Sequence, residues 1–321
     1  MKKTYKVTLK TLAPVFIGGG ETLRKNQYVY DNNTGTAIII DERKLTQWLV
    51  ENDKLNIFIK DISSNKNNRL KEALKSYGLD NFNRIAKYKL KVNGMSKHMN
   101  DLNLFVRDGA NEAYIPGSSI KGALRTCLLK AFEEDTRHNV FGISVGDSTP
   151  LSNENLAVYQ KIDFSKNAPK GLSLYRECVK PNTKVTFILT LEENIACIDK
   201  LQDSIQSTYK AYHEKWALPF VTARTTDLSK YSFFHNYDDF NQDRSLIYLG
   251  GGAGFVSKTL HYKVKDRETA KHDVLKILVN KFPVYRKIKG VPNHVPMALK
   301  LAIEDNKLFE LGKCELFFEE I

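Results

Sequence analysis

The sequence predicts an α+β protein. Period-two alternation near its start places Tyr5, Val7 and Leu9 on one face of a strand. A clear amphipathic helix is expected over residues 119–134, and three strand-like runs follow it. A sheet that is covered by helices on one face and open on the other fits this order of elements. An open sheet face of this kind is one of the surfaces with which proteins bind RNA.

The expected elements divide into two domains, residues 1–195 and 196–321. Asp41 is expected to cap a helix that runs to about Val50. Residues 51–113 are rich in Lys and Asn, and we expect them to form a large insertion in the first domain with a small core of its own. The other expected elements are a helix over 69–77, strands over 156–162, 172–179 and 183–191, helices over 198–216 and 269–281, and a strand over 314–318.

Positive charge indicates the kind of partner. The formal net charge is +12, and residues 54–107 and 258–300 each carry a net charge of +8. Two basic zones on a slightly acidic remainder favour a positive surface for a polyanion, of which nucleic acid is the commonest. A generally basic soluble protein is the alternative.

The cysteines and the hydropathy exclude several classes of protein. The four cysteines form no CxxC pair, which argues against a metal site and against a disulfide framework. The first residues lack the apolar core of a signal peptide, and no apolar run approaches the ~20 residues of a membrane span. We therefore expect a cytoplasmic protein with no membrane partner, no metal and no cofactor.

The segment IPGSSIKGALRT, residues 115–126, is the most informative motif. Pro116 and Gly117 break the chain just before the expected helix, and Ser118 or Ser119 can cap its exposed amides. The amides at the start of a helix form a natural site for an anion.

The charges of this helix run in the unfavourable order. Lys121 and Arg125 come early on one face, and Glu133, Glu134 and Asp135 come last. The helix dipole favours the reverse arrangement, by a few tenths of a kcal/mol for each residue. A phosphate held at the start of the helix would offset the early pair. A solvated basic face after a tight Pro-Gly turn is the alternative.

Two glycine-rich segments are expected to form loops with basic neighbours. The first holds Gly18, Gly19 and Gly20, followed by Arg24 and Lys25. The second holds Gly250, Gly251, Gly252 and Gly254, followed by Lys258. Glycines let a backbone approach a phosphodiester closely, although tight turns explain them equally well. Neither segment has the spacing of a dinucleotide-binding loop or a P-loop.

These three segments resemble the RAMP superfamily of CRISPR proteins. IPGSSIKGALRT resembles the signature helix of that superfamily, PVFIGGG (residues 14–20) the segment after its first strand, and LGGGAGFVSKT (residues 249–259) its glycine-rich loop. The resemblance implies an RRM-like (ferredoxin-like) domain with a large insertion, followed by a second α+β domain that carries the glycine-rich loop.

The arrangement is most similar to the fifth-subunit family of type III-A Csm effector complexes. This similarity implies a non-catalytic subunit that binds CRISPR guide RNA, caps the backbone at its 3′ end and supports guide maturation in antiviral defence. The implied partners are guide RNA, target RNA, the other subunits and a trimming nuclease. The implied RNA-binding residues are Gly18, Gly19, Gly20, Arg24, Lys25, Gly117, Ser118, Ser119, Lys121, Arg125, Gly250, Gly251, Gly252 and Lys258.

No catalytic residue is assigned. Many RAMP proteins carry His where this sequence has Phe16, which makes cleavage harder to place but leaves a ring that can stack on a base. No two histidines have metal-ligand spacing, and general-base cleavage by His138 or His235 has no support from the sequence. Asp238 and Asp239 are paired acids of the kind that can hold Mg²⁺, although a solvated turn is the plainer interpretation. An endoribonuclease that processes guide precursor is the alternative function, and a purely protein-binding adaptor is a third.

Overall fold

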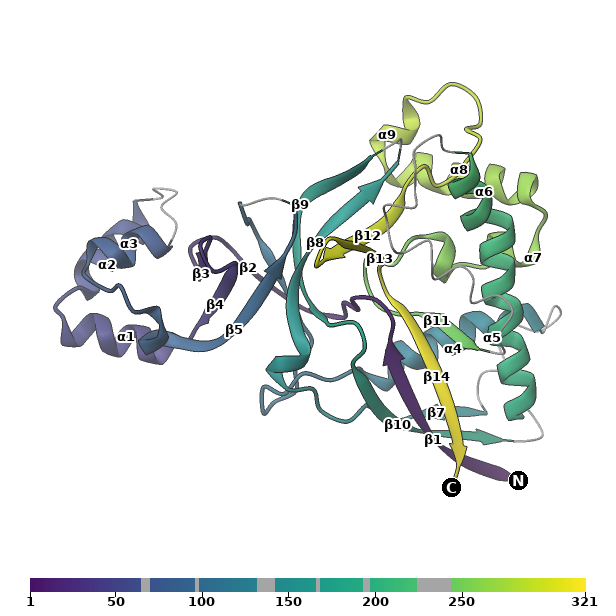
Figure 1. Ribbon diagram of the computed structural model, residues 1–321, viewed down its shortest axis with the longest axis horizontal. Helices are drawn as coiled ribbons and strands as arrows, with labels where there is room; N and C mark the ends of the chain where they lie inside the picture. The colour runs from purple at the N-terminus through teal and green to yellow at the C-terminus, as the bar shows by residue number, and fades with distance from the viewer. Residues whose placement is uncertain (65–69, 96–97, 132–141, 166–167, 193–196, 224–243) are drawn as a thin grey trace.

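The computed structural model describes residues 1–64, 70–95, 98–131, 142–165, 168–192, 197–223 and 244–321. Figure 1 shows two β-sheets, with long helices gathered at one end and a small helical lobe projecting at the other. This mixture of helices and sheets confirms the predicted α+β class. Within the described part of the chain, no helix combines the length and the hydrophobicity needed to span a membrane.

The first sheet has the N-terminal strand at its centre. Its strands, in spatial order, are β11 (Ser245–Tyr248), β14 (Lys313–Glu320), β1 (Lys2–Thr11), β10 (Lys184–Glu192) and β7 (Ile143–Val145). Tyr5, Val7 and Leu9 are buried, as their alternation predicted. β14 pairs antiparallel with β1, so the two chain termini lie close together (Figure 1).

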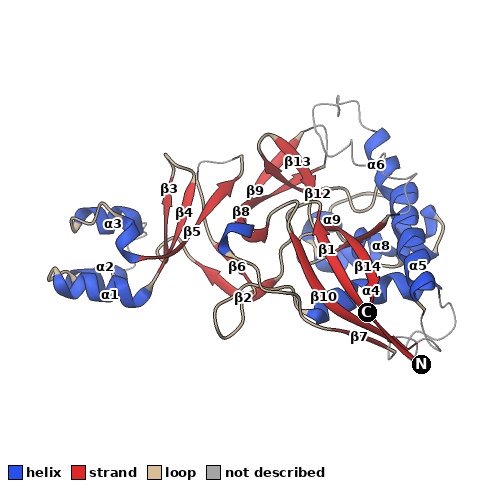
Figure 2. Ribbon diagram, turned by 60° about the horizontal axis from the view of Figure 1, so that its bottom comes forward, coloured by secondary structure: helices blue, strands red, loops and turns tan. Residues whose placement is uncertain are grey.

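Two helices cover one face of this sheet. They are α4 (Gly117–Ala131) and α5 (Ile198–Tyr212), which pack against each other and against the edge strands (Figure 2). Ile120, Leu124 and Leu128 of α4 are buried in the same core as β1, as the helical spacing predicted. The opposite face of the sheet exposes Ile188 and Phe317.

The second sheet is longer and strongly curled. Its main path runs through β2 (Gly18–Leu23), β6 (Leu102–Phe105), β9 (Pro169–Val179), β8 (Leu156–Phe164), β5 (Ala86–Asn93), β4 (Thr36–Ile40) and β3 (Tyr28–Asp31). β12 (Leu299–Glu304) pairs with β8, and β13 (Lys307–Glu310) pairs with β12. The expectation of a flexible loop at residues 18–20 is wrong, because Gly18 pairs with Phe105 at the start of β2.

The projecting lobe has a hydrophobic core of its own. It contains α1 (Glu42–Glu51), α2 (Leu55–Ser63), α3 (Leu70–Ser76) and the short helix η1 (Phe82–Ile85). The Asp41 carboxylate accepts hydrogen bonds from the backbone amides of Arg43 and Lys44 and so caps α1, as predicted. The core of the lobe runs from Val29 to Ile85, so it begins before the expected start of the insertion at residue 51.

The C-terminal third of the chain contributes to both sheets. Its described helical elements are η3 (His213–Ala217, a π-helical turn), α6 (Leu218–Thr222), η6 (Val256–Lys258), α7 (His261–Val264), α8 (Arg267–Lys281) and α9 (Pro283–Arg286). Earlier in the chain, the short helix η2 (Asn153–Asn155) precedes β8. α5 and β14 both follow residue 195, yet both pack around β1. The expected boundary at residue 195 thus crosses one packed unit, and the two-domain division stays a prediction.

Candidate nucleic-acid interface

The signature helix α4 begins at Gly117, with a cap from elsewhere in the chain. The Gly117 amide donates a hydrogen bond of 2.7 Å to Oδ1 of Asp147. Asp147, which follows β7, therefore takes the capping place that we predicted for Ser118 or Ser119. That prediction is wrong because the capping side chain is distant in sequence, where a local pattern cannot reveal it.

Close packing explains the glycine at the start of α4. A Cβ atom at Gly117 would lie 2.3 Å from the Val145 carbonyl oxygen and 2.7 Å from that of Gly146. The Asp147 carboxylate also supplies negative charge at the start of the helix. This charge interacts favourably with the helix dipole and with the basic pair Lys121 and Arg125. A phosphate at the Gly117 amide would compete with that carboxylate. Phosphate binding there stays a prediction, and the acidic residues 133–135 lie outside the described part of the chain.

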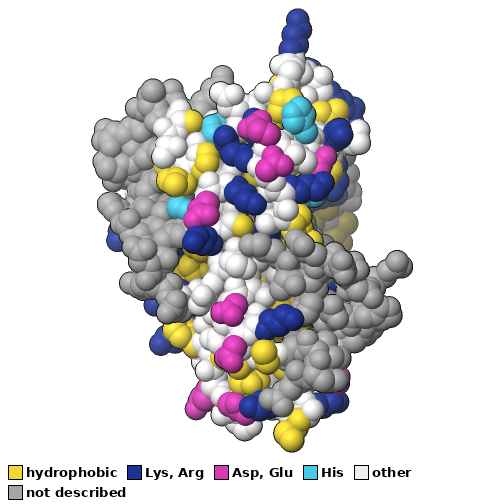
Figure 3. All heavy atoms as spheres, turned by 90° about the vertical axis from the view of Figure 1, so that its right-hand side faces the viewer, with side chains coloured by type: hydrophobic (Ala, Val, Ile, Leu, Met, Phe, Trp, Pro, Cys, Tyr) yellow, Lys and Arg dark blue, Asp and Glu magenta, His cyan; other side chains and the backbone are white. Residues whose placement is uncertain are grey.

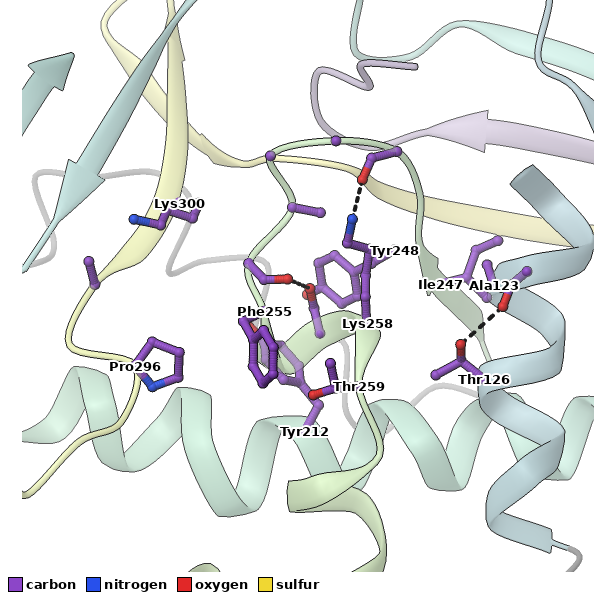
Figure 4. A pocket seen from close by; sticks show the side chains of 18 of the residues that line it. Ala123, Thr126, Tyr212, Ile247, Tyr248, Phe255, Lys258, Thr259, Pro296 and Lys300 are labelled. Carbon is purple, nitrogen blue, oxygen red and sulfur yellow. Dashed lines mark hydrogen bonds between the residues drawn. The ribbon is translucent and has the colours of Figure 1, made fainter. Parts of the chain in front are cut away.

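The basic pair of α4 and its small residues lie on different faces. Ser119, Gly122, Ala123 and Thr126 line a cavity, and Figure 4 shows Ala123 and Thr126 facing it from α4. Lys121 and Arg125 are not among the residues that line this cavity, and Arg125 is exposed. The helix therefore presents a face of small residues to the cavity, and its two basic residues lie on a neighbouring face outside the cavity.

The two glycine-rich segments meet at Phe16. The Gly251 amide donates a hydrogen bond of 2.7 Å to the Phe16 carbonyl oxygen. A Cβ atom at Gly250 would lie 2.0 Å from the same oxygen, and one at Gly18 would lie 2.9 Å from the Phe16 ring. Phe16 is only 9% exposed, and its ring packs against the guanidinium of Arg176 at 4.9 Å. A base-stacking role for Phe16 is therefore wrong, because its ring is buried between the two segments.

Several cations lie around the second glycine-rich loop. Lys258 Nζ donates a hydrogen bond of 2.6 Å to the Gly250 carbonyl oxygen, and Lys300 Nζ donates one of 2.7 Å to Oδ2 of Asp163. Lys161 lies on β8 near Lys300. Arg176 packs against Gly252, where a Cβ atom would lie 2.0 Å from its Nη1 atom.

Burial disfavours the charged forms of Lys161, Lys258 and Arg176 and lowers the pKa of each. Burial, and then the charge of Lys300, lower the pKa of Lys161 to about 8, against the opposing effect of Asp163. Burial also lowers the pKa of Arg176, whose Nε and Nη1 are buried without a hydrogen-bond partner among the described residues. Lys161 and Lys300 share Asp163 as an acidic neighbour, and two cations beside one carboxylate create a positive potential suited to an anionic ligand.

A large cavity connects the helix and the glycine-rich loop. Its volume is about 1320 Å³, and it lies around residues 250–259 between α4, α5, α9 and β12 (Figure 4). Of the residues predicted to bind RNA, the structure brings six to this cavity: Gly18, Ser119, Gly250, Gly251, Gly252 and Lys258. The cavity is thus a concave site with positive charge on its wall and apolar surface behind it.

The other predicted residues lie apart from the cavity. Gly19 and Gly20 are in β2, and a Cβ atom at Gly19 would lie 3.2 Å from the Val106 Cα. Lys25 lines a separate small cavity of about 80 Å³ beside Lys71. Gly117, Ser118, Lys121 and Arg125 belong to α4 but do not line the large cavity. Arg24 follows β2 and is exposed.

The positions of the histidines and of the metal-ligating side chains bear on the alternative of RNA cleavage. Within the described ranges, no histidine lines the large cavity and no group of three metal-ligating side chains occurs. Burial, and then the positive charge of Lys313, lower the pKa of His213 to about 4. His138, His235, Asp238 and Asp239 lie outside the described residues.

Three cations of this site escaped the sequence reasoning. Lys161 and Arg176 lie on the paired strands β8 and β9, and Lys300 is the second residue of β12. Lys300 is the last residue of the predicted basic zone 258–300, and that zone was the sequence signal that pointed to it. Lys161 and Arg176 lie in strands with no local motif, so only the pairing of the sheet brings them to the loop.

Comparison with known proteins defines the class. The family model of the RAMP superfamily matches residues 8–194. A "CRISPR system Cms protein Csm5" of Enterococcus italicus is 35% identical across all of this chain and 99% of that protein. A protein of the same name from Streptococcus thermophilus is 29% identical across 99% of this chain and 98% of that protein.

A solved structure shares the fold. A chain in the cryo-EM structure of a Csm–crRNA–target RNA ternary complex from a type III-A CRISPR-Cas system superposes with a TM-score of 0.73. It is 18% identical, and the match covers 98% of this chain and 100% of that one. The chain therefore belongs to the RAMP superfamily of CRISPR proteins and, within it, to the family of Csm5 proteins.

Proposed function

We propose that this chain is a non-catalytic CRISPR RNA-binding subunit of a cytoplasmic type III-A effector complex. In this proposal it caps the complex at the 3′ end of the guide and supports guide maturation in antiviral defence. The observation that carries the proposal is the cavity at the glycine-rich loop, with Lys161, Lys258 and Lys300 on its wall. The names of the relatives support the assignment to the complex.

The topology supports an RRM-like unit at the centre of the molecule. The elements β1, α4, β7, β10, α5 and β14 occur in the order β-α-β-β-α-β of ferredoxin-like folds. The four strands of this unit are adjacent in the order β14, β1, β10 and β7, and β11 adds an edge strand beside β14. In this view the lobe and the second sheet are additions, and the C-terminal strand completes the central unit.

The guide backbone is proposed to cross this surface from α4 to the glycine-rich loop. Lys121 and Arg125 flank the small-residue face of α4, and Lys258 follows the loop on the far side of the cavity. Phosphates along this path would meet cations at both ends. The proposed partners are guide RNA, target RNA, neighbouring Csm subunits and a nuclease that trims the guide.

Binding of guide RNA by the full chain tests the proposal. Affinity is measured over a range of salt concentrations for the wild type, for Lys161→Ala/Lys300→Ala and for Lys121→Ala/Arg125→Ala. Each double variant should weaken binding and flatten the logarithmic salt dependence by roughly 1.4, because each phosphate contact on a single strand contributes about 0.7. Unchanged affinity and slope in both variants would remove the proposed path.

The alternative of an endoribonuclease has a direct test. Among the described residues that line the cavity there is no histidine, which favours binding without cleavage. Incubation of the purified chain with repeat RNA, with and without Mg²⁺, should leave the RNA intact. Specific cleavage that a cavity variant abolishes would establish the enzyme instead.

A further inference from the structure

The glycine-rich loop separates two sides of the large cavity. Figure 4 shows Thr126 and Ile247 on the side of α4, and Pro296 and Lys300 on the side of β12, with Phe255 between them. On the β12 side, the backbone amide of Met297 donates a hydrogen bond of 3.0 Å to the Tyr285 hydroxyl. This contact places α9 against the segment that leads into β12.

The β12 side combines an exposed ring with apolar walls. Phe282 and Val284 line the cavity although they are 49% and 58% exposed. Half-exposed apolar side chains at the mouth of a cavity, beside lysines, are the arrangement with which proteins stack single-stranded bases. Pro296 and Met297 continue the apolar wall inward.

Two polar groups on this wall lack a partner. Asp163 Oδ1 and Thr259 Oγ1 are buried and form no hydrogen bond with the described part of the chain. Both residues line the cavity, and Asp163 is held in place because its Oδ2 accepts a hydrogen bond from Lys300. Buried polar groups are normally satisfied, and a ligand in the cavity that donates a hydrogen bond would satisfy this carboxylate oxygen.

We infer that the β12 side of the cavity is a pocket for one unstacked nucleobase. This inference rests on the proposed function and adds a base-specific site to its phosphate path. The base stacks on Phe282 at the mouth, its phosphate lies at Lys161 and Lys300, and its exocyclic amino group donates to Asp163 Oδ1. Because uracil lacks such a group, the pocket favours adenine, cytosine or guanine over uracil.

Abasic RNA tests the pocket with the full chain. A short guide-derived RNA is prepared with a single abasic sugar at each position in turn. Binding should fall roughly fivefold to a hundredfold at one position and change little elsewhere, which corresponds to the loss of one stacked base. Equal affinity for all abasic variants would overturn the pocket, while salt-dependent binding of the same RNAs would leave the proposed function intact.

A matched pair of phenylalanines locates the effect. Phe282→Ala should abolish the sensitivity to the abasic position, whereas Phe317→Ala should preserve it. Phe317 is equally exposed, at 48%, but lies on the open face of the first sheet, away from the cavity. Sensitivity that survives in Phe282→Ala would place the base elsewhere and contradict the inference.

Base identity and free nucleotides complete the test. At the sensitive position, cytosine should bind more tightly than uracil, and Asp163→Asn should reduce that difference. Equal binding of the two bases by the wild type would refute the role of Asp163. Adenosine monophosphate should compete only weakly with the RNA. Competition by the free nucleotide at lower concentration than the RNA would show a mononucleotide site and overturn the assignment to the guide strand.

Discussion

At the scale of single residues, the glycines of the motifs are explained by contacts within the chain. Gly250 leaves room for the Phe16 carbonyl oxygen, and Gly252, with φ of +92°, leaves room for Arg176. The sequence indicated that close approach was needed, but it could not say whether the approaching group was a ligand or the protein. Lys161, which lines the cavity, and Arg176, which packs beside Gly252, carried no local signal because strand pairing alone brings them to the loop.

The shifted pKa of Lys161 predicts how guide binding depends on pH. Its ammonium titrates near pH 8, so the free protein loses this charge as the pH rises through that value. RNA favours the charged form, and binding should therefore weaken between pH 7 and 9. Lys161→Arg should flatten this dependence because arginine keeps its charge there. Binding measured at constant ionic strength checks the prediction, which fails if the two proteins show the same pH profile.

At the scale of elements, α4 shows what periodicity could and could not predict. Its buried residues Ile120, Leu124 and Leu128 followed directly from helical spacing. Its cap did not, because Asp147 reaches the helix from the end of another strand. For the same reason, β2 was missed: the pairing with β6 turns a glycine-rich segment into a strand.

Two glycines of α4 should respond in opposite ways to the same substitution. Gly117→Ala would place a Cβ 2.3 Å from the Val145 carbonyl oxygen, and we expect the free energy of unfolding to fall by about 2 kcal/mol or more. Gly122→Ala meets nothing within 4 Å and should raise it by up to about 1 kcal/mol, because alanine favours the helix. Urea denaturation of both variants measures the difference, and equal changes would contradict this account of the helix start.

At the scale of the whole molecule, the chain closes on itself through its C-terminal strand. β14 lies between β1 and β11, and α5 packs on the same sheet. The sequence predicted a strand near the C-terminus, but no local pattern could name its partner, since the pairing joins residues about 310 positions apart. A division of the chain by composition therefore could not reveal this closure.

A fragment of residues 1–195 should not form a stable fold by itself. Without β14, the strand β1 becomes an edge with unpaired backbone groups, and without α5 the core exposes the surface that Leu201 and Ile205 cover. Co-expression with residues 196–321 should restore a folded protein. Circular dichroism and thermal denaturation distinguish the cases, and a cooperative transition of the fragment alone would support two independent domains instead.

The central claim is that guide RNA lies against the cavity at the glycine-rich loop. Crosslinking of guide RNA to the assembled complex, followed by identification of the modified peptides, tests it most directly. We predict crosslinks to the peptides that contain Lys161, Lys258 and Lys300, located near the 3′ end of the guide. Assembly of the complex with crosslinks to other subunits and none to this chain would contradict the claim and favour a protein-binding adaptor.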